Sequence, residues 1–367
     1  MKPWLVVAGG AHRSGGQDRA NLEVVRFLAR ERGCAVHLVT HQSDPEVRSW
    51  PGVTVHTVSR PLGSIALGER LLERQAERVH GALGASAIAL ANGGNYQHAT
   101  VNWVHSVHSA WPVLDAGASP ARRLYAQLRK REDRRRERRA LGAARLVVAN
   151  SPKTARELES ALGVPLSRVV VVPFGSDPRP SLRTDRNWNG RLGFIGALGW
   201  DRNKGLDTAL SALKRLVDQG HSEMTLSVAG PGSSAPWSAH AARLGLGRRV
   251  RFLGLVHDVP RLLSELDLIL SPVRYEAYGL AVQEALVAGV PTLVSARAGI
   301  AELLSQRAPP FVVVDHEDPA AWEAAVSRVK GNYRSFVEAT DRVGAEFASR
   351  SWDEMAHELV AAVETRT

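Results

Sequence analysis

The stretch PVRYEAYGLAVQEALVAGVPTLVSARAGIAE, residues 272–302, follows a short apolar run at 268–270 that is typical of a buried strand. Gly279 separates a loop from a helical pattern over 280–288. A Gly-Val-Pro sequence ends that pattern before the next apolar strand, residues 292–294. Strand, loop, helix and strand in this order form a βαβ unit. Open parallel sheets bind ligands beside the carboxyl ends of their strands, so we expect a binding site in this loop.

Two carboxylates, Glu276 in the loop and Glu284 in the helix, lie eight residues apart. Carboxylate oxygens accept hydrogen bonds in pairs, which suits the neighbouring hydroxyls of a sugar or a ribose. The N–H groups of Tyr278, Gly279 and Leu280 lie at the helix start, where a phosphate is favoured. These are the features of a nucleotide-sugar site. An arbitrary pair of acids at this spacing is more often one helix cap and one solvated side chain.

The segment EAYGLAVQEALVAGVPTLVS resembles the E-x7-E signature of glycosyltransferase family 4, a family of retaining enzymes with the GT-B fold. Other parts of the chain match the family pattern in the expected order and cover most of its length. The resemblance implies an α/β protein with two doubly wound, Rossmann-like parallel-sheet domains that face a cleft. It also implies that Glu284 holds the ribose hydroxyls, that Glu276 holds sugar hydroxyls, and that the amides of residues 278–280 hold the diphosphate.

The composition permits two domains of ordinary size. The chain has 367 residues, of which 44% are hydrophobic, enough for a core in each domain. A single cysteine, Cys34, excludes an intramolecular disulfide and suits a reducing cytoplasm. The first ten residues resemble a strand rather than a signal peptide, and no apolar run is long enough to cross a bilayer. We therefore expect a cytoplasmic protein, peripheral on the inner membrane face at most.

Strands and helices alternate in both halves of the chain at the spacing of parallel doubly wound sheets. We predict an acceptor-side domain over residues 1–177 and a nucleotide-sugar-binding domain over residues 191–345. Between them, residues 178–190 are rich in proline, arginine and aspartate and are predicted to form the linker. The amphipathic tail, residues 346–367, is predicted to be a helix that returns to the first domain, as the resemblance to GT-B proteins implies.

A glycine-rich loop follows the first predicted strand, residues 4–8, and precedes a helix predicted over residues 21–30. Glycine lets the backbone approach a phosphate or a sugar closely. The loop does not have the G-x-G-x-x-G pattern, so it gives little support to a dinucleotide site. The resemblance implies that Gly15 and Gly16 are the glycine pair that faces the donor.

Two histidines follow the strand that starts at Val101. His105 falls at or just past the carboxyl end of that strand, on the side of the predicted cleft. The family carries a histidine after the corresponding strand, near the acceptor and the reacting carbon. His105 matches it by position, with His108 as the competing choice, and two loop histidines that cap a strand end are the alternative interpretation. No histidines or cysteines have metal-ligand spacing, so we predict that no metal or other cofactor is required.

A second anion site is predicted after the strand of residues 192–196, where a loop carries Lys204 directly before a helix. A cation at this place suits a diphosphate, although an exposed loop lysine is the alternative interpretation. The family has a lysine-glycine pair that Lys204 and Gly205 match. It also usually has an arginine where this chain has Ala197. One diphosphate contact is therefore missing or supplied elsewhere, with Arg202 as the nearest substitute.

The net charge is +10, and the segment of residues 121–139, ARRLYAQLRKREDRRRERR, holds ten basic and three acidic side chains, hence +7 of that charge. Its apolar stripe of Leu124, Tyr125 and Leu128 is typical of a basic amphipathic helix on an anionic membrane surface. A solvated charged helix is the alternative. No aromatic platform or recognised module accompanies the arginines, so no nucleic acid partner is expected.

These features predict a retaining, hexosyltransferase-like glycosyltransferase that moves a sugar from a UDP- or GDP-sugar to an acceptor hydroxyl. The catalytic roles would fall on His105, Lys204 and Glu276. The pathway would be synthesis of a cell-envelope glycan, a glycolipid or a secondary metabolite, and the acceptor is unknown, with the basic helix favouring an anionic or membrane-borne one. Two alternatives remain. One is a nucleotide-sugar epimerase or glycogen-type phosphorylating enzyme on the same fold, and the other is a non-catalytic basic protein that docks on membrane or nucleic acid.

Overall fold

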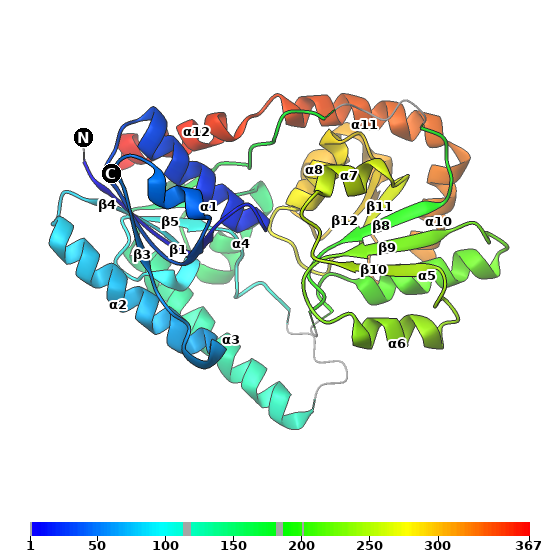
Figure 1. The fold of residues 1–367 in the computed structure, drawn as a ribbon, viewed down its shortest axis with the longest axis horizontal. Helices are drawn as coiled ribbons and strands as arrows, with labels where there is room; N and C mark the ends of the chain where they lie inside the picture. The colour runs from blue at the N-terminus through cyan, green and yellow to red at the C-terminus, as the bar shows by residue number, and fades with distance from the viewer. Residues whose placement is uncertain (1, 113–118, 181–185, 200–201) are drawn as a thin grey trace. The chain divides into compact units, whose positions relative to one another are not determined.

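The computed structural model describes residues 2–112, 119–180, 186–199 and 202–367. The chain divides into two compact units (Figure 1). The described residues of unit 1 are 2–111, 119–175 and 351–367. Unit 2 comprises Ser176–Arg350 and, among the described residues, also Pro112. The predicted linker, residues 178–190, lies partly outside the described residues, so its limits stay a prediction.

Unit 1 contains a seven-stranded parallel sheet in the order β3-β2-β1-β4-β5-β6-β7. Its central strands are continuous apolar runs, as expected where helices cover both faces of a sheet. The strand order reverses between β1 and β4, which makes the carboxyl ends of these two strands the switch point of the sheet. The strands are β1 (Trp4–Ala11), β2 (Val36–Ser43), β3 (Val53–Thr57), β4 (Ile88–Asn92), β5 (Val101–Val104), β6 (Leu146–Ala149) and β7 (Val169–Val171).

Helices from both ends of the chain cover the unit 1 sheet. The last helix lies beside the first helix, and the ion pair of Arg32 with Glu364, 2.6 Å apart, joins it to the turn after the first helix (Figure 1). Ser351 and Glu354 form a capping box at its start. The helices are α1 (Gly16–Arg26), α2 (Ile65–Leu83), α3 (Pro120–Ala143), α4 (Pro152–Leu162) and α12 (Trp352–Arg366), with short turns η1 (Phe27–Glu31), η2 (Pro45–Ser49), η3 (Pro61–Gly63), η4 (Gly93–Asn95) and η5 (Leu166–Arg168).

The first helix begins earlier than the sequence pattern predicts. The apolar periodicity predicts residues 21–30, whereas the helix begins at Gly16. Gly15 has φ of +97°, a conformation that glycine adopts without strain, and its carbonyl accepts the first helical bond from the N–H of Arg19 at 2.9 Å. The prediction was late because the first helical turn is not buried, and periodicity detects only the part of a helix that packs on the core.

Unit 2 contains a six-stranded parallel sheet in the order β10-β9-β8-β11-β12-β13. The order reverses between β8 and β11. The strand, helix and strand predicted around residues 268–294 occur as β11, α8 and β12 with nearly the predicted limits. Two parallel, doubly wound α/β sheets confirm the predicted fold class. The strands are β8 (Arg191–Ile195), β9 (Thr225–Ala229), β10 (Val250–Gly254), β11 (Leu268–Ser271), β12 (Thr292–Ser295) and β13 (Val312–Val313).

Successive residues of β11 show how the unit 2 sheet is covered on both faces. Ile269 packs in a cluster with side chains of α7 and α8, whereas Leu268 and Leu270 belong to the larger core that contains α5. In Figure 1, α5 and α6 lie on one side of the sheet and α7, α8 and α11 on the other. No helix in the described ranges is both long and apolar enough to span a bilayer. The helices are α5 (Leu206–Asp218), α6 (Ala235–Arg243), α7 (Val259–Ser264), α8 (Leu280–Val287), α9 (Ile300–Arg307), α10 (Pro319–Gly331) and α11 (Tyr333–Ala348), with the short turn η6 (Pro309–Phe311).

Candidate active site

Two loops meet at the switch point of the unit 2 sheet, where β8 and β11 are neighbours. The loop after β8 carries Lys204, and the loop after β11 carries Glu276. The Lys204 ammonium donates a hydrogen bond to the Glu276 carboxylate, and their side chains are 33% and 26% exposed. The lysine loop and the E-x7-E loop, which the sequence pattern identifies separately, therefore lie together at the edge where open parallel sheets bind ligands.

Hydrogen bonds to the backbone hold the same two loops together beneath this ion pair. The buried side chain of Asn203 donates its Nδ2–H to the carbonyl of Tyr275 at 2.8 Å, and the N–H of Arg274 donates to the carbonyl of Asn203 at 2.8 Å. Bonds in both directions between adjacent loop residues fix their relative position, because a buried polar group that lost its partner would cost free energy.

Gly205 allows the close contact between the two loops. It has φ of +75°, and a Cβ atom built there would lie 1.9 Å from the carbonyl oxygen of Pro272. No side chain fits this space without displacing the loop after β11. The lysine-glycine pair predicted from the sequence therefore has a structural reason: the glycine brings the loop of Lys204 against the loop of Glu276.

We expect Gly205→Ala to destabilise unit 2 by about 3 kcal/mol, and the matched variant Gly245→Ala by about 1 kcal/mol. Gly245 has nearly the same φ, +74°, but no atom lies within 4 Å of its added Cβ. Gly245→Ala therefore carries only the cost of the left-handed conformation, and the difference of about 2 kcal/mol is the cost of overpacking against Pro272. Denaturant unfolding of both variants measures the difference. Equal losses of stability would show that the contact with Pro272 has no energetic weight.

The start of α8 forms the third part of the site. Gly279 has φ of +116°, and a Cβ atom there would lie 2.9 Å from the side chain of Ile300. The N–H of Ile300 donates to the carbonyl of Tyr278 at 2.7 Å, which fixes the turn before the helix. The first N–H groups of a helix have no acceptor within it and favour an anion. Leu280 begins α8, as the sequence pattern predicts.

The side chain of Tyr278 is engaged in the interior of unit 2. Its hydroxyl donates to the Gln283 side chain, whose Nε2–H donates to the hydroxyl of Ser176 at 2.7 Å. Burial raises the pKa of the Tyr278 hydroxyl well above its usual range, so the hydroxyl stays a proton donor. The hydroxyl is therefore engaged inside unit 2, and the donor-binding role predicted for Tyr278 concerns its backbone N–H.

The remaining predicted residues of unit 2 are exposed. Glu284 lies on α8 with an exposed side chain. Arg202 has φ of +54°, and its nearest described carboxylate is Asp207, with Nη1 and Oδ2 3.9 Å apart. The structure therefore brings Lys204 next to Glu276 but directs the Arg202 guanidinium toward the start of α5.

In unit 1, the glycine pair and the histidine lie at the carboxyl ends of strands. Gly15 and Gly16 occupy the start of α1, after β1. His105 follows β5, and its ring lies between those of Trp103 and Phe174, with centroids 4.5 Å and 5.6 Å away. Neither ring nitrogen of His105 has a hydrogen-bond partner among the described residues. Burial lowers the pKa of His105 to about 3, so at neutral pH the imidazole is uncharged, with one donor and one acceptor nitrogen.

The sequence pattern missed Arg274 and Asp207, an ion pair that joins the Glu276 loop to the first turn of α5, directly after the Lys204 loop. Arg274 lies two residues before Glu276, and Asp207 lies three residues after Lys204. Charged residues at such places in a loop have no spacing that distinguishes them from solvated ones, so only their shared position in the fold reveals the pair. In the part of the chain that the structure covers, no group of three or more histidine, cysteine or acidic side chains could hold a metal ion.

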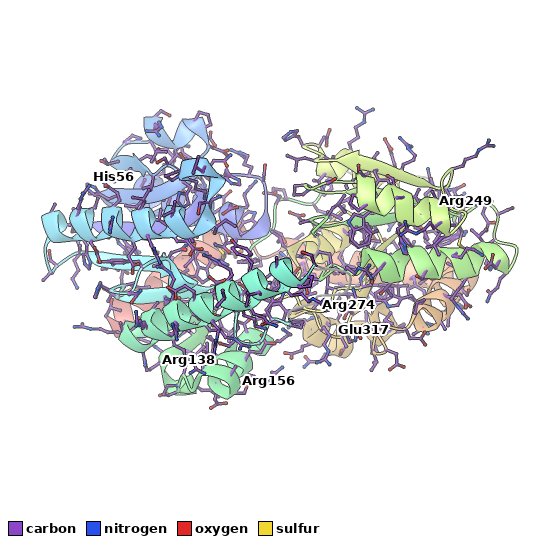
Figure 2. All side chains as sticks on the ribbon, turned by 90° about the horizontal axis from the view of Figure 1, so that it is seen from below. His56, Arg138, Arg156, Arg249, Arg274 and Glu317 are labelled. Carbon is purple, nitrogen blue, oxygen red and sulfur yellow. The ribbon has the colours of Figure 1, made fainter. Side chains whose placement is uncertain are left out.

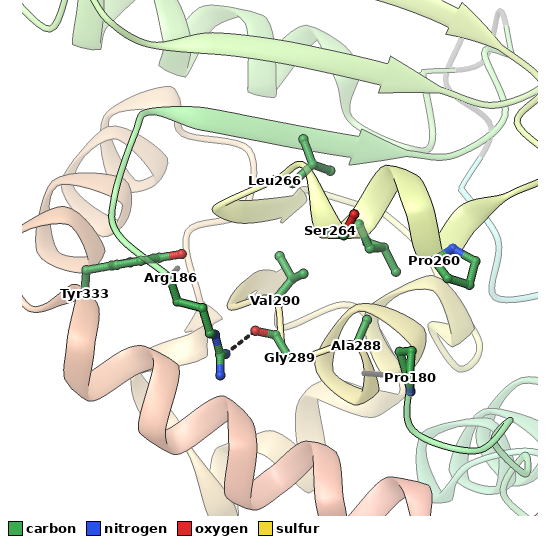
Figure 3. Close-up of a pocket in the computed structure, with 10 residues that line it drawn as sticks. Pro180, Arg186, Pro260, Ser264, Leu266, Ala288, Gly289, Val290 and Tyr333 are labelled. Atoms are coloured by element: carbon green, nitrogen blue, oxygen red, sulfur yellow. Dashed lines mark hydrogen bonds between the residues drawn. The ribbon is translucent and has the colours of Figure 1, made fainter. Parts of the chain in front are cut away.

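A small pocket of about 40 Å³ in unit 2 contains none of these residues (Figure 3). Gly289 and Val290, which precede β12, line it, as does Leu266, which precedes β11. It therefore lies toward the amino ends of these strands, opposite to the loops that carry Lys204 and Glu276. The Arg186 guanidinium donates to the carbonyl of Gly289 at its wall. A space of this size admits a water-sized molecule and not a nucleotide sugar.

The model of family 4 glycosyltransferases in conflict systems matches residues 5–359. The chain belongs to this family. It is therefore a glycosyltransferase, as the E-x7-E segment and the lysine-glycine pair predict. The D-inositol 3-phosphate glycosyltransferase of Geodermatophilus obscurus is 28% identical to this glycosyltransferase over 397 residues, which cover 96% of this chain and 85% of the relative.

Solved structures of other proteins share the fold of this family 4 member. Sucrose-phosphate synthase from Thermosynechococcus elongatus has a TM-score of 0.77 at 18% identity, covering 100% of this chain and 99% of that one. HepE from Anabaena in complex with UDP-glucose has a TM-score of 0.72 at 17% identity, covering 99% of both chains. These likenesses confirm the predicted GT-B fold.

Proposed function

We propose that this glycosyltransferase moves a sugar from a nucleotide diphosphate sugar, a UDP- or GDP-sugar, to an acceptor hydroxyl with retention of the anomeric configuration. The observation that carries the proposal is the ion pair of Lys204 with Glu276 in the loop that leads into the start of α8. A cation and the N–H groups at a helix start suit a diphosphate, and a carboxylate next to them suits the hydroxyls of the attached sugar. The complex of HepE with UDP-glucose supports this class of donor.

In this proposal different unit 2 residues bind different parts of the donor. Lys204 and the N–H groups of residues 278–280 stabilise the negative charge that develops on the leaving diphosphate. Glu276 holds sugar hydroxyls near the reacting carbon, and Glu284 holds the ribose hydroxyls. Preorganised groups of this kind lower the barrier because they need no rearrangement when charge develops. Since an ammonium and amides already oppose that charge, the proposal requires no metal ion.

We also propose roles for three unit 1 residues, on the ground of the family resemblance. The N–H groups at the start of α1, after Gly15 and Gly16, add to the stabilisation of the diphosphate. The uncharged imidazole of His105 orients the acceptor or the transferred sugar through a hydrogen bond, not through a positive charge. In front-face attack the bond from the anomeric carbon to the diphosphate breaks while the acceptor oxygen bonds on the same face. The acceptor proton then passes to the leaving diphosphate oxygen.

Proton NMR of slow donor hydrolysis tests both the transfer and its stereochemistry. With water as acceptor and UDP-α-glucose or GDP-α-mannose as donor, we expect the free sugar to appear first as its α-anomer, before mutarotation. First appearance of the β-anomer would contradict retention. An isomerised nucleotide sugar without release of free sugar would identify an epimerase instead.

We further propose that the enzyme binds peripherally to an anionic membrane, which also presents its acceptor. The described chain has nine exposed large hydrophobic side chains, and six of them, between 44% and 101% exposed, lie in only two segments. The ion pairs of Arg129 with Glu69 and of Arg136 with Glu73 hold these segments side by side. Arg123 and Arg131 are exposed near this cluster. The apolar-basic surface consists of Leu62, Ile65 and Leu67 around the start of α2 and Leu124, Tyr125 and Leu128 on α3.

We expect the double variant Leu124→Ser, Leu128→Ser to lose at least about tenfold in affinity for anionic vesicles. Two apolar side chains then no longer enter the interface, where each buried CH₂ contributes about 0.8 kcal/mol. Co-sedimentation with phosphatidylglycerol-containing vesicles measures the change, and Leu255→Ser, at an exposed leucine of unit 2, is the control. No binding to anionic vesicles, or an equal loss in the control, would contradict membrane contact through this surface.

A further inference from the structure

The Arg274 guanidinium donates four hydrogen bonds, which connect it to three segments of unit 2. Its two Nη atoms donate to the two carboxylate oxygens of Asp207, both at 2.9 Å. Nη1 also donates to the carbonyl of Arg202 at 2.7 Å, and Nε donates to Glu317 at 3.0 Å. Figure 2 labels Arg274 and Glu317, which lie close together. A guanidinium is suited to this place because its donors form a rigid planar fork.

The Arg274–Asp207 pair joins the same two loops as the Lys204–Glu276 pair. Asp207 lies in the first turn of α5, directly after the lysine loop, and Arg274 lies two residues before Glu276. The two links differ in burial. The side chains of Arg274 and Asp207 are 14% and 19% exposed, whereas those of Lys204 and Glu276 are 33% and 26% exposed. We call the less exposed Arg274–Asp207 pair the inner link and the more exposed Lys204–Glu276 pair the outer link. The inner link is bidentate, and the outer link is a single hydrogen bond.

This difference matters when a donor binds. In the proposed function, the ammonium of Lys204 pairs with the diphosphate, and the carboxylate of Glu276 accepts hydrogen bonds from the sugar hydroxyls. Their direct contact is then exchanged for contacts to the donor, so the outer link no longer holds the loops. The inner link involves neither group and persists. The distance between the Lys204 ammonium and the Glu276 carboxylate is then set by Arg274 and by the hydrogen bonds that join Asn203 to Tyr275 and to the N–H of Arg274.

We propose that Arg274 is a positioning residue that keeps the Lys204 loop and the Glu276 loop in register while the donor is bound. The inference rests on the proposed function, since it concerns the geometry of that donor site. It predicts that the reaction depends on the fork of the guanidinium and not only on its charge. A lysine at this place keeps the charge but cannot bond both oxygens of Asp207, the carbonyl of Arg202 and Glu317 in this geometry.

The test compares Arg274→Lys with Arg191→Lys. Arg191 also pairs with an aspartate of unit 2, its Nη2 lying 2.9 Å from Asp267, but it begins β8 at the edge opposite to the site. We expect Arg274→Lys to lower kcat/KM for donor hydrolysis by about 10- to 100-fold, since small displacements of reacting groups have effects of this size. The loss falls mainly in kcat, and the Kd of free UDP changes less than about threefold, because Lys204 still binds the diphosphate. Arg191→Lys lowers the melting temperature without changing kcat/KM.

Asp207→Asn provides the second arm, because it removes the other partner of the same link. Combined with Arg274→Lys it should add little to the loss in kcat/KM, as expected for two residues that act together. Unchanged kcat/KM in Arg274→Lys, or an equal loss in Arg191→Lys, would overturn the inference while leaving the proposed function intact. Absence of donor binding and hydrolysis in the unmodified protein would overturn the proposed function and this inference with it.

Discussion

Replacing Lys204 by alanine is expected to lower the turnover of the donor by about 100-fold or more, the usual cost of losing one preorganised group that opposes developing charge. The ammonium lies at the edge of the sheet where β8 ends, and it pairs with Glu276 of the E-x7-E loop. In the proposed function it therefore contacts the diphosphate of the bound donor. Its interaction strengthens as the bond to the anomeric carbon breaks, because negative charge then grows on the diphosphate. Binding of the intact donor is expected to weaken by less than about tenfold.

Steady-state hydrolysis and calorimetric titration of the same donor separate these two effects for Lys204→Ala. Lys214→Ala is the matched control, since Lys214 is a lysine of α5 that pairs with Asp218 one turn away. The control should retain wild-type kinetics. Turnover within about twofold of wild type in Lys204→Ala would remove this residue from the catalytic machinery.

Replacing Glu276 by glutamine is expected to strengthen the binding of free nucleotide and to lower the turnover of the nucleotide sugar. The variant frees Lys204 from its ion pair and removes a negative charge beside the diphosphate site. Free UDP should therefore bind about 3- to 10-fold more tightly, which corresponds to about 1 kcal/mol for a partly exposed pair. Turnover of the nucleotide sugar should fall by about 100-fold, because the sugar is no longer held in its reacting position.

Calorimetry with UDP and kinetics with the nucleotide sugar test this pair of effects in Glu276→Gln. The control is Glu223→Gln, which removes a comparable ion pair with Lys330 elsewhere in unit 2. Unchanged or weaker binding of UDP would mean that Glu276 does not compete with the diphosphate for Lys204. Unchanged turnover would mean that it does not hold the sugar.

The local part of the site could be predicted from sequence because glycine and proline mark its boundaries. Gly279 requires a positive φ, and Pro291 follows the end of α8, so the loop, the helix and the next strand were predicted with nearly their observed limits. His105 was predicted at the end of its strand because the strand is a short apolar run with a clear end. These features depend on neighbouring residues only.

The pairing across the site could not be predicted, because it depends on the strand order. Lys204 and Glu276 are 72 residues apart and meet only because β8 and β11 are neighbours in the sheet. The burial of His105 between aromatic rings likewise depends on Phe174, which is distant in sequence. The early start of α1 was missed because its first turn does not pack on the core.

Calorimetric titration of a donor panel into the unmodified protein and Glu284→Ala is the most direct test of the proposed nucleotide-sugar site. The panel contains UDP-, GDP-, ADP- and dTDP-sugars, with NAD as a control. We expect one donor to bind and Glu284→Ala to weaken it by at least about tenfold, the value of a charged hydrogen bond to the ribose. Glu265→Ala, at another exposed carboxylate of unit 2, should leave the affinity unchanged. Binding of no donor, or equal affinity in Glu284→Ala, would contradict the proposed site.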